Sequence, residues 1–138
     1  MALATDTLER LAYAALAEDV GEGDVTTEAT VDPDDEGAAQ ILIKEPGVVC
    51  GLAIAEVVFR ALDSDVRFER LSDEGDAVEA GQTVAVVSGP LRAILTGERT
   101  ALNYVGRLSG IATLTRRYVD AVERTGVAIL DTRKTTPG

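Results

Sequence analysis

The sequence contains no histidine or tryptophan, only one cysteine, Cys50, and only two lysines among its 138 residues. A single cysteine excludes an internal disulfide, and without histidine these residues cannot build a zinc site from cysteine and histidine ligands. No apolar run is long enough to span a bilayer, and the first residues lack the basic and then apolar pattern of a signal peptide. We therefore expect a cytoplasmic protein that makes no membrane contact.

Basic residues are scarce in the first two thirds of the chain and are concentrated in the last third. Residues 1–91 hold 20 acids and 5 bases, a net charge of −15, whereas residues 92–138 hold 4 acids and 8 bases, a net charge of +4. Aromatic residues are few and the bases form no dense tract, which disfavours nucleic acid as the partner. The charge distribution favours a small, highly charged anion bound by the last third.

The first 90 residues have the pattern of a mixed α/β structure. Apolar residues at helical spacing predict one helix from an N-cap at Asp6 to about Gly21 and a second over 54–62. Short strands are expected on both sides of the Pro46–Gly47 turn, over 66–71, and over 83–87. The acidic stretch EDVGEGDVTT, residues 18–27, could be a metal loop, but it lacks the spacing of a calcium hand and also fits a solvated turn.

The residues after Pro90 predict a long helical region followed by a strand. Two apolar stripes, Leu91 with Leu95, Leu102 and Val105, and Ile111 with Leu114, Tyr118 and Val122, predict two consecutive helices or one kinked helix that ends at Gly126. The unbroken apolar run 127–130 then predicts a strand buried on both faces. A helix that leads into such a strand is typical of the start of a β/α barrel or a doubly wound sheet.

Arg133 and Lys134 are the candidate binding residues. Adjacent cations are common on open surfaces, but just past the carboxyl end of a buried strand they would point into a shared pocket, where guanidinium and ammonium groups bind carboxylate or phosphate. The hydroxyl of Thr132 lies beside them. Arg99 is a further candidate, because it falls on an apolar helical stripe. Its guanidinium could reach solvent at the edge of that stripe, or it could reach across an interface into another subunit.

Three motifs, EDVGEGDVTTEAT, ERTALNYVGRLSGIATLTRRYVDAV and ILDTRKTTPG, together resemble the quinolinate phosphoribosyltransferase family. The resemblance covers the whole chain but only the N-terminal half of such an enzyme. It implies an α/β (α+β) fold, in which residues 1–107 form an open-faced α/β sandwich with a linking helix. Residues 108–138 would then form the start of an incomplete α/β barrel, one helix and the first strand.

The resemblance also implies roles for individual residues. Thr132, Arg133 and Lys134 would bind quinolinate and phosphoribosyl pyrophosphate, and Arg99 would reach the active site of the other subunit of a homodimer. The family reaction yields nicotinate mononucleotide, pyrophosphate and carbon dioxide on the route to NAD and uses Mg²⁺, for which these residues supply no identified ligand. The other catalytic groups of the family would lie beyond Gly138, so we expect this chain alone to be inactive and marginally stable.

Three other interpretations stay open at this stage. A molybdenum-transport-associated paralogue shares the family pattern. The segment SDEGDAVEAGQTVAVVSG, residues 72–89, resembles half of a biotinyl or lipoyl carrier domain, although neither lysine has the required hairpin setting. A non-catalytic dimerisation module is the third.

Overall fold

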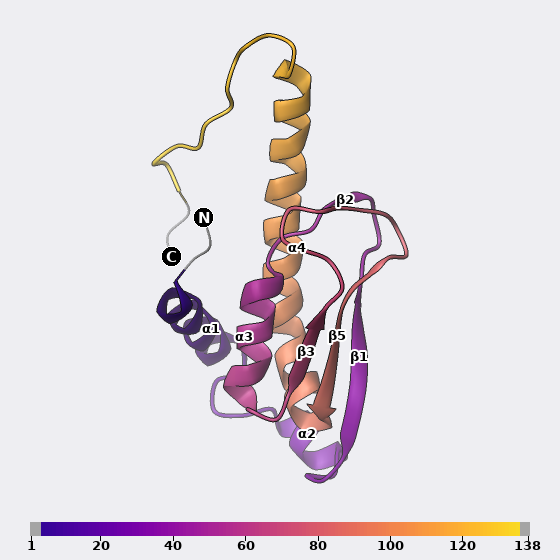
Figure 1. Ribbon diagram of the computed structural model, residues 1–138. Coiled ribbons are helices and arrows are strands. Elements are labelled where there is room, and N and C mark those ends of the chain that lie inside the picture. The colour runs from indigo at the N-terminus through magenta and orange to yellow at the C-terminus, as the bar shows by residue number, and fades with distance from the viewer. Residues whose placement is uncertain (1–3, 136–138) are drawn as a thin grey trace.

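The computed structural model describes residues 4–135, which form an α/β sandwich and a long helix that extends beyond it (Figure 1). The elements in chain order are α1 (Thr5–Asp19), α2 (Val25–Thr30), β1 (Glu36–Leu42), β2 (Gly47–Val48), α3 (Leu52–Leu62), β3 (Arg67–Arg70), β4 (Ala77–Val78), β5 (Thr83–Pro90) and α4 (Leu91–Val122). The α/β class predicted from the sequence is confirmed.

The sheet is three-stranded and antiparallel, with β5 at its centre in the order β1-β5-β3. Gly37 pairs with Gly89 and Phe68 with Val87, which sets the register of the two edge strands against β5. A separate two-stranded ribbon is made by β2 and β4. The strands on the two sides of the Pro46–Gly47 turn therefore belong to different sheets, because each pairs with a later segment.

The core lies between one face of the sheet and the helices α1, α3 and α4, and its largest fully buried side chains are Leu52, Val49, Val58, Val84 and Val87. Figure 1 shows α3 and α4 on the same side of the sheet. On the other face the hydroxyl of Thr83 donates to the exposed Gln40. The sandwich is therefore open on one face.

The region after Pro90 is one unbroken helix, α4, and not the two consecutive helices that were one of the two alternatives expected from Gly97, Gly106 and Gly110. Its buried face matches the predicted stripe only in part, since Val105 is buried whereas Leu95 and Leu102 are about two-fifths exposed. The buried face also includes Ile94 and several smaller residues, Ala93, Gly97, Thr100 and Ala101. Glycine is required at position 97, where α4 packs closely on α3, because a Cβ there would lie 2.9 Å from side-chain atoms of both Phe59 and Leu62. No helix in the described range 4–135 has the length and hydropathy needed to cross a membrane.

The helices and strands predicted before Pro90 are confirmed, with small differences at their ends. The first helix begins at Thr5 and its N-cap is Ala4, so Asp6 lies inside the first turn and is not the cap. The acidic stretch after α1 contains an unexpected short helix, α2, capped by the side chain of Asp24. Gly126 lies in a turn beyond the helix end, at φ +74°.

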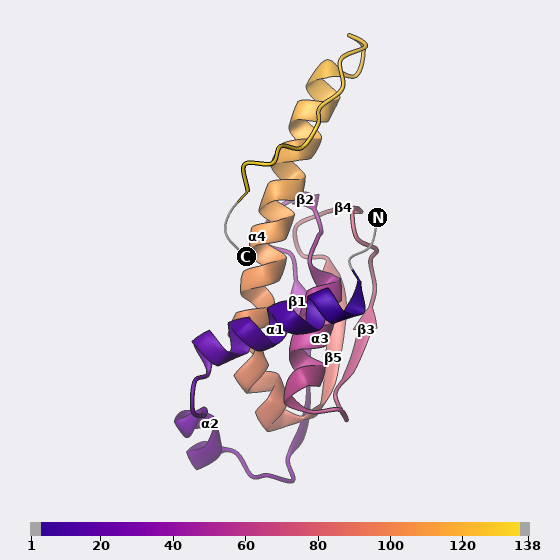
Figure 2. The ribbon, with the colours of Figure 1, turned by 90° about the vertical axis from the view of Figure 1, so that its left-hand side faces the viewer.

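The strand predicted over residues 127–130 is wrong for the structure of this chain. These residues form no regular element, and Leu130 is 80% exposed. A strand requires a neighbouring strand for its backbone hydrogen bonds, and none of the strands described between residues 4 and 135 pairs with this segment. Figures 1 and 2 show the segment as an irregular trace that leaves the end of α4 and turns back in the direction of the sandwich.

Candidate functional site

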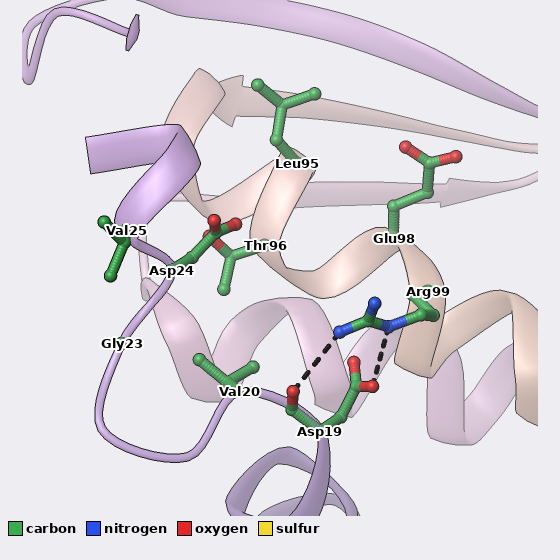
Figure 3. Close-up of a pocket in the computed structure, with 9 residues that line it drawn as sticks. All are labelled: Asp19, Val20, Gly23, Asp24, Val25, Leu95, Thr96, Glu98 and Arg99. Carbon is green, nitrogen blue, oxygen red and sulfur yellow. Dashed lines mark hydrogen bonds and ion pairs between the residues drawn. The ribbon is translucent and has the colours of Figure 1, made fainter. Parts of the chain in front are cut away.

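Arg99 projects from α4 toward the carboxyl end of α1, where it pairs with Asp19 (Figure 3). Its Nε donates to Oδ1 of Asp19 at 2.7 Å, and its Nη2 donates to the main-chain oxygen of Asp19 at 3.3 Å. The side chain of Arg99 is 72% exposed, whereas that of Asp19 is 23% exposed. The guanidinium is therefore anchored along one edge and open to solvent along the other.

Asp19 is in turn held by the residue that follows Arg99. The hydroxyl of Thr100, which is only 3% exposed, donates to the second carboxylate oxygen of Asp19 at 2.9 Å. One carboxylate thus binds two consecutive residues of α4 and ties α1 to that helix. Because both contacts are hydrogen bonds to a charged group, each is stronger than a neutral one.

Asp24 is the second organising carboxylate of this region. It accepts the backbone N–H of Thr27 at 3.0 Å and the Thr27 hydroxyl at 2.6 Å, which caps α2, and it accepts the hydroxyl of Thr96 on α4 at 3.1 Å. The hydrogen bonds from Thr27, hydroxyl first, lower the pKa of Asp24 below its usual value, and Thr96 and the nearby Arg99 lower it further against the effect of burial. Asp24 is therefore stabilised in its charged form.

Replacing Asp24 with alanine is expected to lower the melting temperature of the chain by several degrees at pH 7 and by much less at acidic pH. A lowered folded-state pKa stabilises the fold above the unfolded pKa of about 3.9, and this stabilisation is lost as the pH falls through the folded-state value. Thermal denaturation of both chains from pH 7 to pH 3 measures the difference. Asp24→Asn, which keeps a capping oxygen without the charge, is the control; a constant difference across this range would contradict the prediction.

Asp19, Asp24, Arg99 and Glu98 border a pocket of about 490 Å³ between the α1–α2 loop and α4 (Figure 3). Three carboxylates and one guanidinium make its wall mixed in charge, so it offers an anion a single cationic edge. In the part of the chain that the structure describes, no three acidic, histidine or cysteine side chains gather closely enough to hold a metal ion. The acidic stretch after α1 thus forms a capped turn and a helix.

Thr132, Arg133 and Lys134 lie in the exposed segment beyond α4. The hydroxyl of Thr132 accepts the backbone N–H of Lys134 at 3.2 Å, which forms a local turn. Among residues 4–135 no hydrogen bond or ion pair joins these three residues to Arg99. The structure therefore does not gather the predicted binding residues into one pocket of this chain.

Neither Asp19 nor Thr100 is among the candidate residues predicted from the sequence. One signal was available for Asp19, because Glu18 and Asp19 occupy the last turn of α1, which contains no basic residue. Carboxylates are unfavourable at that end of a helix dipole. Thr100 offered no signal, since its contact with Asp19 spans 81 residues of sequence.

The fold is an α/β sandwich from which a long helix, α4, extends, and Arg99 on that helix pairs with Asp19 at the end of α1. A family model described as "Quinolinate phosphoribosyl transferase, N-terminal domain" matches residues 24–109, and the corresponding C-terminal domain model matches residues 111–138. The chain belongs to the quinolinate phosphoribosyl transferase family. Residues 72–89, which resemble half of a carrier domain, lie within the first match and supply β4 and most of the central strand β5.

Relatives of known name and structure agree with this assignment. A Synechocystis protein named "Probable nicotinate-nucleotide pyrophosphorylase (carboxylating)" is 48% identical over 89% of this chain, and a quinolinate phosphoribosyltransferase (decarboxylating) of Nicotiana tabacum is 42% identical over 97% of it. The crystal structure of NadC from Streptococcus pyogenes superposes with a TM-score of 0.94 at 37% identity over 99% of the chain. The nicotinate-nucleotide pyrophosphorylase from Francisella tularensis gives a TM-score of 0.91 at 34% identity, also over 99%.

The chain spans about 40% of the length of these curated relatives, 41% and 38% respectively, and 49% of each of the two solved chains.

Proposed function

We propose that the protein acts in the transfer of the phosphoribosyl group of phosphoribosyl pyrophosphate to the ring nitrogen of quinolinate, with release of pyrophosphate and carbon dioxide and formation of nicotinate mononucleotide. The observation that carries the proposal is the match of both family models in one chain, over residues 24–109 and 111–138. The names of the relatives agree with it. A cytoplasmic location, as part of NAD biosynthesis, belongs to the same proposal.

Arg133 and Lys134 are the proposed substrate-binding cations, with the Thr132 hydroxyl beside them. Quinolinate is a dianion and phosphoribosyl pyrophosphate carries more negative charge still, so a site that holds both needs several cations. Both side chains lie in an exposed segment within the second family match. The net charge of +4 over residues 92–138, against −15 over residues 1–91, directs anions to this part of the chain.

Arg99 is proposed to bind the same substrates from the other subunit of a homodimer. Its open edge faces solvent, and its bonds within this chain go to Asp19 on the opposite edge. A guanidinium held in this way is available to an anion supplied by a second protomer.

Mg²⁺ is proposed to enter together with phosphoribosyl pyrophosphate, whose oxygens are the ligands that this ion prefers. Bound there, it would neutralise charge that develops on the departing pyrophosphate. No described residue of this chain is assigned to the metal, because none of their acidic side chains form a suitable cluster.

The test is pyrophosphate release from phosphoribosyl pyrophosphate and Mg²⁺, with and without quinolinate, by the longest form of the protein that its gene encodes. Release that depends on quinolinate is expected, and the chain 1–138 assayed beside it is expected to give none. Nicotinate, which lacks the second carboxylate, is the matched control for the acceptor. Release that is indifferent to quinolinate would contradict the proposal and favour another acceptor, such as that of a paralogue.

A further inference from the structure

The side chain of Arg99 has an unusual setting for an exposed arginine, because one full edge of its guanidinium is bound while the rest is open. Asp19 occupies Nε through its carboxylate and Nη2 through its main-chain oxygen. Figure 3 shows the remaining nitrogen pointing away from Asp19. Within residues 4–135 this nitrogen, Nη1, has no hydrogen-bond partner. A long, exposed arginine otherwise samples many rotamers, and holding it in one costs conformational entropy.

Asp19 is suited to hold that edge because it is fixed in two ways. Its backbone belongs to the last turn of α1, and its second carboxylate oxygen is bound by the buried Thr100 hydroxyl. Thr100 is rigid because it lies in the α4 face that packs into the sandwich, where it is 3% exposed. The buried Thr100 therefore restrains the side chain of Asp19, and Asp19 in turn restrains the exposed side chain of Arg99.

The placement of Asp19 works against helix stability. A carboxylate in the last turn of a helix meets the negative end of the helix dipole, and α1 has no basic residue there to offset it. Exposed ion pairs such as that of Arg99 also contribute little to stability. Natural proteins break such local rules mostly at functional sites, so the position of Asp19 makes it a candidate for a functional role.

We propose that Asp19, fixed by Thr100, is a positioning residue that orients Arg99 so that the outer edge of its guanidinium is presented to a substrate anion. This inference rests on the proposed function of Arg99 as a substrate-binding residue. It predicts that Asp19 affects catalysis only through Arg99, and that the hydroxyl of Thr100 is required and its methyl group is not.

The experiment is a double-mutant cycle in the longest form of the protein that its gene encodes, with kcat and KM for quinolinate as the readout. Asp19→Ala is expected to lower kcat/KM roughly tenfold, since a misplaced binding group loses much of its effect. In the Arg99→Ala background the same substitution is expected to change kcat/KM less than twofold, because the group it positions is gone. An equal loss in both backgrounds would overturn the proposal and assign Asp19 a purely structural role.

Three further variants sharpen the test. Thr100→Val removes the hydroxyl and is expected to reproduce part of the Asp19→Ala loss, whereas Thr100→Ser keeps the hydroxyl and is expected to retain wild-type kinetics. Glu22→Ala removes an exposed carboxylate three residues after Asp19 and controls for a general change in charge. If Thr100→Ser and Thr100→Val lowered kcat/KM equally, the proposal that the Thr100 hydroxyl fixes Asp19 would be overturned.

Titration calorimetry of the same variants with inorganic pyrophosphate measures binding without turnover. It therefore distinguishes a failure of this inference from a failure of the proposed function. If wild-type protein showed no quinolinate-dependent turnover, the proposed function would fail. The inference would still be supported by a weaker pyrophosphate affinity in Asp19→Ala that disappears in the Arg99→Ala background. Pyrophosphate affinities that are unchanged or strictly additive in that case would overturn it as well.

Discussion

Gly51→Ala is expected to lower the free energy of unfolding of the 138-residue chain by about 3 kcal/mol, through backbone strain of roughly 1–3 kcal/mol and overpacking of similar size. Gly51 lies at φ +103° as the N-cap of α3. A Cβ added there would meet the main-chain oxygen of Tyr104 and the Cα of Val105, both at 3.1 Å. Backbone atoms of α4 cannot move aside as a side chain could.

Glu74 also prevents Gly51 from relaxing. Its two carboxylate oxygens accept the backbone N–H groups of Gly51 at 2.7 Å and of Ala53 at 2.8 Å. These hydrogen bonds hold the first turn of α3 in place, so the strain in the variant must be taken up by the α3–α4 packing. Denaturation of both chains in urea measures the loss.

Gly75→Ala is the matched control for this prediction. Gly75 has a similar φ of +95°, but a Cβ there would meet nothing within 4 Å. It therefore carries the backbone strain without the collision, and its loss of stability is expected to be about 1–2 kcal/mol. Equal losses at Gly51 and Gly75 would show that the contact with α4 contributes nothing.

Arg133→Ala is expected to lower kcat/KM for quinolinate by about a hundredfold in the longest form of the protein that its gene encodes. Under the proposed function its guanidinium binds a substrate carboxylate or phosphate through charge-assisted hydrogen bonds, and losing such a bond costs about 1.5–3 kcal/mol. Steady-state kinetics over a range of quinolinate concentrations measures the change. Arg133→Lys, which keeps the charge but not the paired N–H donors, is expected to fall between alanine and wild type.

Arg67→Ala provides the control, because Arg67 is an exposed arginine on the edge strand β3, distant in sequence from the proposed binding segment. Its kinetics are expected to match those of the wild type. If Arg133→Ala retained wild-type kcat/KM, the binding role proposed for Arg133 would be excluded, whatever the outcome for Arg99.

Local patterns in the sequence were sufficient to predict α1, α3, β3 and β5, because their hydrophobic periodicity and their turn residues agree. These local patterns gave wrong predictions where tertiary packing determines which residues are buried or paired. The leucines of α4 form an apolar stripe, yet Leu95 and Leu102 are partly exposed, while α3 approaches so closely at Gly97 that no side chain fits there. The run 127–130 has the composition of a buried strand, but composition cannot supply the neighbouring strand that its backbone requires.

The candidate site likewise contains some residues that the sequence marks and others that only the tertiary structure brings in. Arg99 could be proposed from the sequence because an arginine on an apolar stripe is unusual, and Arg133 and Lys134 because cations follow an apolar run; the binding role of all three stays a prediction. The partner of Arg99 could not be found, since Asp19 lies 80 positions earlier and only the packing of α1 on α4 brings the two together. The cap at Asp24 was hidden because acidic residues between glycines also fit a solvated turn.

The two family models, over residues 24–109 and 111–138, meet inside α4. The two matched regions are therefore joined by a continuous helix and not by a flexible linker. Each residue of an α-helix turns the chain by about 100° and advances it by about 1.5 Å. One residue gained or lost at the join would therefore swing the segment that carries Arg133 and Lys134 by more than a quarter of a circle about the helix axis. Insertions should be tolerated in the surface loops of this protein but not in α4, where the number of residues sets the rotational phase between its two halves.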